Sequence, residues 1–228
     1  MSRLAFITGG ARGIGAAIKA ELERSGCNVV APARAELDLA DVASVENYLA
    51  AHSNLPVDIL INNAGGRRQN IATEEMPLEV WRELMDLNLT SVFLCTKLIG
   101  GAMVARGQGG RIINIASINA LVAGRKIAGR HYETSKAAVV QFTRATAADW
   151  APHKITANAI LPGGFMTDAN LRWKSIHPEV IETFQQQIPL GRYGEPHELG
   201  PLAVYLASDA SAYMTGASLV IDGGYTLW

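Results

Sequence analysis

Short runs of β-branched and other apolar residues alternate along this chain with longer segments of helical periodicity. Runs that are apolar at every position suit strands buried on both faces, as in a parallel sheet covered by helices. The alternation therefore predicts repeated βαβ units and a doubly wound parallel sheet. The strand-like runs are LAFIT (4–8), NVVA (28–31), VDILI (57–61), RIINIA (111–116), ITANAI (155–160) and SLVI (218–221), and the helical stretches lie at about 14–25, 41–52, 78–105, 133–150 and 196–207.

The spacing of these runs predicts a single domain over residues 1–228. The sequence has no linker rich in Pro, Ser or Gly, no low-complexity block and no repeat of solenoid length. One connection is unusually short, because only PARAELDLAD follows NVVA before the next helical stretch. Since a parallel crossover needs a dozen or more residues, we expect a loop there with at most one helical turn. One edge of the sheet should therefore be thin.

Composition narrows the class of protein. Hydrophobic residues make up 49% of the 228 residues and charged residues 18%, which is typical of a compact soluble protein. The formal net charge of -1 argues against nucleic acid as a main partner. No stretch reaches the roughly 20 apolar residues that a membrane span needs, and the apolar run in MSRLAFITGG is too short for a signal peptide.

The two cysteines, Cys27 and Cys95, form neither a metal motif nor a disulfide framework. We expect both thiols to be reduced. These features together predict a cytoplasmic protein without a metal site.

The first strand leads into TGGARGIG, residues 8–15, and then into a good helical sequence. Gly9, Gly13 and Gly15 stand at the spacing of a turn that brings backbone N–H groups and a helix N-terminus up to a pyrophosphate. A glycine pattern alone is weak, because a strand-to-helix turn can need glycines for its own geometry. Its place in the first βα turn favours cofactor binding over a purely structural turn.

The loop TGGARGIG resembles the TGxxxGxG loop of the short-chain dehydrogenase/reductase family. Several motifs in a fixed order over nearly the whole chain are far more specific than any one of them. The further matches are NNAG at 62–65, Asn88 in DLNLTSVF, Ser117 after IINIA, Tyr132 and Lys136 in a Tyr-x3-Lys pair, Pro162-Gly163 followed by Thr167, and IDGGY at 221–225.

The resemblance implies a single-domain, Rossmann-type, doubly wound parallel sheet of about seven strands, with a helical substrate loop at about 168–190. It also implies a dinucleotide cofactor, NADP or NAD, at the carboxyl ends of the strands. The cofactor contacts that we predict are Thr8, Gly9, Arg12, Gly13, Ile14, Gly15, Arg34, Asp38, Leu39, Asn62, Ala64, Gly65, Tyr132, Lys136, Pro162, Gly163, Phe165 and Thr167.

Tyr132 and Lys136 lie four residues apart, on one face of a predicted helix. A free phenol has a pKa of about 10, so bringing it near 7 needs about 4 kcal/mol of preferential stabilisation of the phenolate. A cation about 4 Å away at an effective dielectric of 20 supplies about that much. Tyr132 can then act as general base in alcohol oxidation and general acid in carbonyl reduction. In the family, the lysine also hydrogen-bonds the nicotinamide ribose.

Two more residues complete the catalytic set that the resemblance implies. Ser117 follows a strand at its carboxyl end, and its hydroxyl would hold and polarise the substrate oxygen. Asn88 lies within the long helical stretch, where asparagine has poor propensity. The family's reason is a helix distortion and a bound water that extends the proton relay from Lys136, although a solvent-facing polar position would also explain it. Fifteen residues separate Ser117 from Tyr132, so the loop between them must bulge.

The end of the second strand bears on the choice between the two cofactors. The acidic residue that would grip the ribose hydroxyls of NAD is replaced by Ala33, and Arg34 follows. A guanidinium there can bind a 2′-phosphate, and Arg12 can add a second cation. We therefore favour NADP, the alternative being that Arg34 only points to solvent. Asp38 and Leu39 flank the adenine by resemblance.

Charges near the predicted site hint at the substrate. Arg125 and Arg130 are our candidate substrate contacts, and with Lys126, Arg67 and Arg68 they would suit a carboxylate or phosphate. Solvated loop charges explain them equally well. The sequence is most similar to sugar-acid and polyol dehydrogenases of the family, of the gluconate or deoxygluconate type.

Two other functions stay open. One is a 3-oxoacyl-carrier reductase, and the other is a regulatory protein that senses NADP(H) without turnover. The complete set of Asn88, Ser117, Tyr132 and Lys136 argues against the sensor. Small residues on the helices at 78–105 and 133–150, such as Ala137, Ala138, Ala145, Ala147 and Ala148, predict a homotetramer by resemblance.

Overall fold

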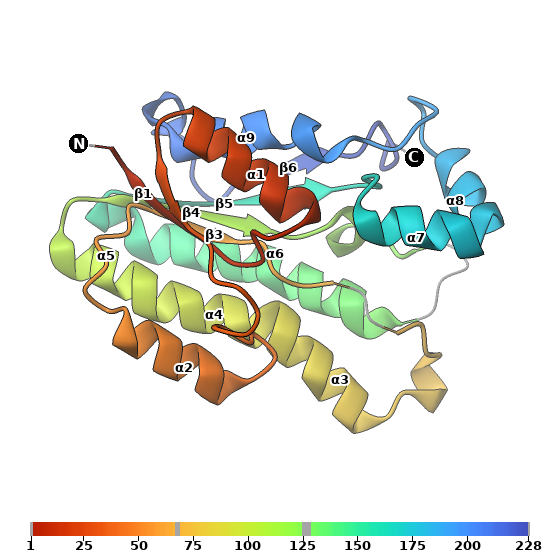
Figure 1. The fold of residues 1–228 in the computed structure, drawn as a ribbon, viewed down its shortest axis with the longest axis horizontal. Coiled ribbons are helices and arrows are strands. Elements are labelled where there is room, and N and C mark those ends of the chain that lie inside the picture. Colours follow the sequence, from red (N-terminus) through yellow and green to blue (C-terminus); the bar gives the residue numbers. More distant parts are fainter. Residues whose placement is uncertain (1, 67–68, 125–128, 228) are drawn as a thin grey trace.

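The computed structural model describes residues 2–66, 69–124 and 129–227. Parallel strands form one central sheet with helices on both faces (Figure 1). Helices α1 (Gly13–Arg24) and α9 (Gly200–Ala207) pack together on one face. The other face carries α2 (Val42–Ala51), the long helix Leu78–Arg106 and α6 (Arg130–Trp150). This is the doubly wound arrangement that the alternation predicts.

The sheet has six strands in the order β2-β1-β3-β4-β5-β6, and every pairing is parallel. Each of the six strand-like runs forms one of them. The strands are β1 (Leu4–Ile7), β2 (Asn28–Val30), β3 (Ile59–Asn62), β4 (Gly110–Ile115), β5 (Ile155–Pro162) and β6 (Ser218–Ile221). The chain order reverses between β1 and β3, and doubly wound sheets bind ligands in the crevice outside the carboxyl ends of the strands at such a point.

The sheet of the described residues has six strands where we expected about seven, and the connection after β2 explains the difference. Residues 31–40 form turns and loop, and they contain no helix. Without a crossover helix the chain cannot return to lie parallel beside β2. Leu37 and Leu39 are nevertheless buried and pack into a core cluster with Val45 and Leu49 of α2. The thin sheet edge is therefore confirmed, and β2 is only three residues long.

The predicted helices are present with small shifts of their ends. Helix α6 begins at Arg130, three residues earlier than expected, and the stretch 196–207 divides into a 3₁₀ turn (Pro196–Glu198) and α9. The segment at 168–190 contains α7 (Asp168–Ile176) and α8 (Pro178–Gln185). Both helices lie beyond the carboxyl ends of the strands (Figure 1), so this segment stands beside the predicted site.

The helix Leu78–Arg106 is continuous but irregular. It consists of α3 (Leu78–Met85), a π-helical turn (Asp86–Thr90), α4 (Ser91–Cys95), a second π-helical turn (Thr96–Gly100) and α5 (Gly101–Arg106). By length and composition alone it could cross a membrane, yet half of its most apolar window is buried inside the protein. Leu87, Leu94 and Met103 pack into the core below the sheet, which accounts for its apolar character.

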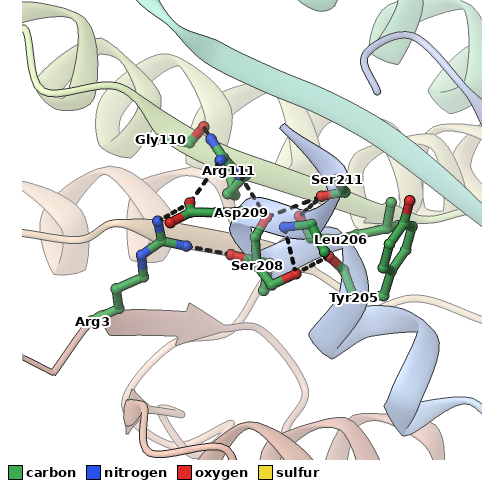
Figure 2. Close-up of polar contacts among 10 residues, drawn as sticks. Arg3, Gly110, Arg111, Tyr205, Leu206, Ser208, Asp209 and Ser211 are labelled. Atoms are coloured by element: carbon green, nitrogen blue, oxygen red, sulfur yellow. Dashed lines mark hydrogen bonds and ion pairs between the residues drawn. The ribbon is translucent and has the colours of Figure 1, made fainter. Parts of the chain in front are cut away.

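A charged cluster fastens the amino ends of the strands, opposite the crevice. Figure 2 shows Asp209 between two arginines. Its Oδ1 accepts from Arg3 Nη2 at 2.5 Å and from Arg111 Nη2 at 3.2 Å. The hydrogen bond from Arg3 and the positive charge of both arginines hold the pKa of Asp209 below its usual value. The cluster therefore ties the turn after α9 to β1 and β4.

Candidate active site

The crevice at the reversal point is held by Thr8 and Asn63. Thr8 Oγ1 accepts from the backbone N–H of Asn63 and from that of Ala64, each at 3.0 Å. Asn63 Nδ2 donates to the carbonyls of Thr8 and Gly9. The end of β1 and the end of β3 are thereby locked together, which fixes the start of the glycine loop.

The glycine loop ends at an open helix N-terminus. Helix α1 has Arg12 as its N-cap, with no side-chain hydrogen bond to the first turn, so the first N–H groups of the helix are available to an anion. A Cβ on Gly15 would lie 2.1 Å from the carbonyl oxygen of Gly9, so only glycine permits this approach of helix to loop. Thr167, from the end of the β5 region, comes within van der Waals reach of Gly13. These features fit a dinucleotide pyrophosphate.

Lys136 lies at the carboxyl end of the sheet. It is 4% exposed, and its Nζ donates to the carbonyl of Ile115 at 2.8 Å. Burial lowers the pKa of Lys136 to about 8. Ser117 follows Ile115 by two residues and is also buried, while Tyr132 is partly buried one helical turn before Lys136 on α6. The fold therefore brings these three predicted catalytic residues to one edge of the sheet.

Asn88 joins the same region from the long helix. It lies in the π-helical turn Asp86–Thr90 and is fully buried, so the solvent-facing alternative is wrong and the expected helix distortion is confirmed. Its side chain accepts from the N–H of Gly66 at 2.9 Å and donates to Ser135 Oγ at 3.1 Å. Ser135 Oγ in turn donates to the Tyr132 carbonyl at 2.7 Å. Asn88 is thus coupled directly to the helix that carries Tyr132 and Lys136.

Three predicted cofactor residues have side chains that are buried within the fold. Asn62 is 2% exposed and donates to Asn114 Oδ1 at 2.8 Å and to Thr96 Oγ1. Leu39 and Phe165 are buried in the two core clusters on opposite faces of the sheet. The side chain of Asn62 is thus used in hydrogen bonds within the fold, and those of Leu39 and Phe165 pack in the core. The motif position was informative, but the direction of the side chain was not.

The turn after β2 carries charges of both signs. Arg34 Nη2 lies 3.2 Å from Asp38 Oδ2, and the arginine side chain is 73% exposed. The carboxylate of Glu36 accepts from the backbone N–H of Ala33 at 2.8 Å. Ala31 lies against Gly10 of the glycine loop, so the turn is adjacent to the predicted adenosine end of the cofactor.

The predicted substrate contacts divide into two groups. Arg125, like Lys126, Arg67 and Arg68, lies outside the described residues. Arg130 is described, and its Nη1 donates to both carboxylate oxygens of Glu133 and to the carbonyl of Gly124. These bonds favour a structural role for Arg130 over a contact with substrate.

Similarity to known proteins was assessed with this geometry in hand. The family model described as enoyl-(acyl carrier protein) reductase matches residues 32–226. The chain belongs to the short-chain dehydrogenase/reductase family. Galactitol 2-dehydrogenase (L-tagatose-forming) of Cereibacter sphaeroides is 38% identical over 244 positions, covering 98% of this chain and 95% of that protein. A 3-oxoacyl-[acyl-carrier-protein] reductase of Synechocystis is 34% identical, covering 100% of this chain and 98% of the relative.

A solved structure agrees with these relatives. The protein from Beutenbergia cavernae assigned as an NAD(P)-dependent gluconate 5-dehydrogenase, crystallised with NADP at low occupancy, superposes with a TM-score of 0.91 at 34% identity. The match covers 99% of this chain and 97% of that one. This short-chain dehydrogenase/reductase is an NAD(P)-dependent oxidoreductase that interconverts an alcohol and a ketone. Among the residues that the structure describes, no cluster of His, Cys, Asp or Glu could hold a metal ion.

Sequence reasoning missed three residues of this region. Asn63 belongs to the NNAG motif, which was a usable signal, and Ser135 lies between Tyr132 and Lys136. Glu133 carried no signal at all, because its partner Gly124 is remote from any motif. Asn63 and Ser135 act on the backbone of residues that the motifs identify, whereas Glu133 acts on the backbone of Gly124.

Proposed function

We propose that this protein oxidises a secondary alcohol of a polyol or sugar acid, or reduces the corresponding ketone, with NADP(H) as the favoured cofactor. The observation that carries the proposal is the buried Lys136 ammonium, one helical turn after Tyr132, which donates to the carbonyl of Ile115 at the end of β4, two residues before Ser117. The names of the relatives, galactitol 2-dehydrogenase and gluconate 5-dehydrogenase, support a polyhydroxylated substrate.

Each residue has a distinct role in this proposal. The nicotinamide ring, when bound, accepts or supplies the hydride. The Tyr132 phenolate takes the proton of the substrate alcohol in oxidation, and the Tyr132 hydroxyl donates a proton to the carbonyl oxygen in reduction. The Lys136 ammonium favours the phenolate form of Tyr132, and the Ser117 hydroxyl donates to the substrate oxygen. Asn88 holds the Gly66 backbone and Ser135, which keeps α6 in place.

The cofactor preference rests on charge at the turn after β2. Ala33 provides no carboxylate for the ribose hydroxyls, while Arg34 and Arg12 are exposed cations beside the glycine loop. Helix α1, the glycine loop and Thr167 would hold the pyrophosphate and the nicotinamide half. We place the protein in the cytoplasm, where thiols such as Cys27 and Cys95, both free here, remain reduced.

We also propose a homotetramer. Phe93 and Leu98 of the long helix are large apolar residues that remain 44% and 37% exposed in the single chain. The small residues Ala137, Ala145 and Ala148 are exposed on α6, whereas Ala147 is buried in the core. Close packing of these helices against a second copy would cover both sets.

The deciding experiment follows NADP(H) absorbance with galactitol, glycerol, gluconate and acetoacetyl-CoA. We expect oxidation of a polyol or of gluconate by wild type, loss of at least a thousandfold in kcat for Tyr132→Phe, and retained NADPH binding by that variant. Turnover of acetoacetyl-CoA alone would favour the 3-oxoacyl reductase, which the Synechocystis relative supports. NADPH binding with no turnover of any kind would favour the sensor.

A further inference from the structure

Side chains from the first turn of α6 bind the backbone of Gly124, which lies in the loop before this helix. Glu133 Oε1 accepts from the backbone N–H of Gly124 at 2.8 Å. Arg130 Nη1 donates to the carbonyl of the same Gly124 at 3.2 Å and to both Glu133 oxygens at 2.9 Å. Both backbone polar groups of one buried residue are therefore bound by side chains from a single helical turn. We call Gly124, Arg130 and Glu133 the loop clamp.

The clamp is built around a buried carboxylate. Glu133 is 9% exposed, and its carboxylate accepts from the Gly124 N–H and, at both oxygens, from the Arg130 guanidinium. A carboxylate in this position is stable only while those donors remain, because an unpaired buried charge is strongly unfavourable. The first turn of α6 thus binds both the N–H and the carbonyl of Gly124.

Two hydrogen bonds connect Ser117 with Val122, which precedes Gly124 of the clamp by two residues. Ser117 Oγ accepts from the N–H of Asn119 at 3.1 Å, and Asn119 Nδ2 donates to the carbonyl of Val122 at 3.3 Å. The 3₁₀ turn Ile118–Ala120 between them packs on α6. A short path of contacts therefore runs from Ser117 through Val122 and Gly124 to Glu133, the residue next to Tyr132.

This path explains how a long loop is compatible with a fixed site. Ser117 and Tyr132 are fifteen positions apart in the sequence. A free loop of that length would leave the position of the Ser117 hydroxyl relative to the Tyr132 hydroxyl undefined. The clamp closes the loop after seven residues, at Gly124. The clamp therefore ties the described segment that follows Ser117 directly to the helical turn that carries Tyr132.

We propose that Glu133 is a positioning residue for the reaction, which sets the placement of the Ser117 side of the active site against Tyr132, and that Arg130 serves the clamp and not the substrate. The inference rests on the proposed function in one respect, since it assumes that Ser117 and Tyr132 act on the same oxygen. Small displacements of paired catalytic groups lower the rate by up to about a hundredfold, so the clamp acts on kcat.

The test compares Glu133→Gln and Glu133→Ala with Thr134→Ala as the matched control. Thr134 is the exposed neighbour of Glu133 and bonds only its own helix, at the Arg130 carbonyl. Glutamine can still accept from Gly124 but cannot accept twice from Arg130, so we expect kcat to fall roughly tenfold for Gln and nearer a hundredfold for Ala. NADPH affinity, measured by fluorescence, and the apparent pKa values of the pH–rate profile should stay those of wild type.

A second measurement needs no substrate. Hydrogen exchange of the backbone amides in residues 118–124 should become at least tenfold faster in Glu133→Ala, with residues 137–150 unchanged. If wild type turns over none of the four compounds, the proposed function fails while this exchange still decides whether the clamp exists. Unchanged exchange in Glu133→Ala, or kcat within twofold of wild type in that variant, would overturn the inference.

The role of Arg130 is tested with substrates of different charge. For Arg130→Lys, a clamp residue predicts the same factor of change in kcat/KM for neutral galactitol and for anionic gluconate. A loss confined to gluconate and expressed in KM would show that Arg130 binds the substrate carboxylate, and would refute this part of the inference.

Discussion

Replacing the buried Lys136 by methionine should make the unliganded protein more stable while removing its activity. Burial lowers the pKa of Lys136 from 10.5 to about 8. A shift of that size corresponds to about 3 kcal/mol by which the native structure disfavours the ammonium, at 1.36 kcal/mol per unit. The hydrogen bond from Nζ to the Ile115 carbonyl returns about 1 kcal/mol. Lys136→Met should therefore gain roughly 2 kcal/mol near pH 7.

The direction of the pKa shift determines how the stability difference between wild type and Lys136→Met changes with pH. Because the pKa is lower in the native state than in the unfolded state, the unfolded chain binds more protons between pH 8 and 10.5. Stability of wild type then rises with pH across this window, relative to a variant without the amine. The advantage of Lys136→Met should be constant below pH 8 and should disappear, or reverse by about 1 kcal/mol, near pH 10.5.

Urea unfolding at pH 7.5, 9 and 10.5 measures this difference. Protein concentration must be the same throughout, because subunit association adds to apparent stability. Lys19→Met is the control, since Lys19 is an exposed lysine paired with Glu23 on α1. A difference between wild type and Lys136→Met that does not vary with pH, or a variant less stable than wild type at pH 7.5, would refute the assignment of a desolvated ammonium.

Three further outcomes are expected. Gly65→Ala should lose turnover and cofactor binding, because its Cβ would lie 2.7 Å from Asn88 Oδ1. Gly66→Ala is the control and should retain both, because the space around its Cβ is open. Equal effects of the two substitutions would contradict this prediction. Light scattering should give four times the chain mass of 24.4 kDa, and a monomer would exclude the tetramer. Asp209→Asn should be less stable than wild type at pH 7, with a difference that shrinks as pH falls below 3.8, because Arg3 lowers the pKa of Asp209; a difference unchanged by pH would exclude the ion pairs as its cause.

The strands were predictable because burial on both faces leaves a clear mark on the sequence. All six runs became strands, and their ends moved by no more than two residues, for example from 57–61 to Ile59–Asn62. The sheet has six strands and not seven because the connection after β2 is too short to contain a crossover helix. Leu37 and Leu39 are buried in the core from a segment of turns and loop that forms no strand.

The site was predictable in its positions and not in its side-chain directions. Motifs place Asn62 and Asn88 equally well, yet Asn62 turns into the sheet interior and Asn88 faces Gly66 and Ser135. The direction depends on which strand or helix lies opposite, which the sequence does not state. The role of Glu133 was even less predictable from the sequence. In the sequence it is one charge near the start of a helix, and only the fold brings Gly124 to its carboxylate.

Neighbouring carboxylates also reduce the free energy by which Arg34 is expected to favour NADP. Arg34 alone would give NADP about 1.5 to 3 kcal/mol through charge-assisted hydrogen bonds to the 2′-phosphate. In the structure Arg34 is paired with Asp38, an exposed ion pair of the kind that contributes about 0 to 1 kcal/mol, and this pair must open. Glu36 adds a negative charge where its carboxylate accepts from the Ala33 N–H.

The net preference for NADP should therefore be roughly tenfold, at the low end of what the guanidinium can provide, since 1.4 kcal/mol is a factor of ten. Arg34→Ala should abolish this preference without changing kcat/KM for NADH, and Asp38→Asn should increase it by freeing the guanidinium. The measurement is kcat/KM for both cofactors at one fixed ionic strength, because phosphate binding is screened by salt. Equal losses for both cofactors in Arg34→Ala would mean that the turn is only structural, and a wild-type preference for NADH would mean that Glu36 and Asp38 outweigh Arg34.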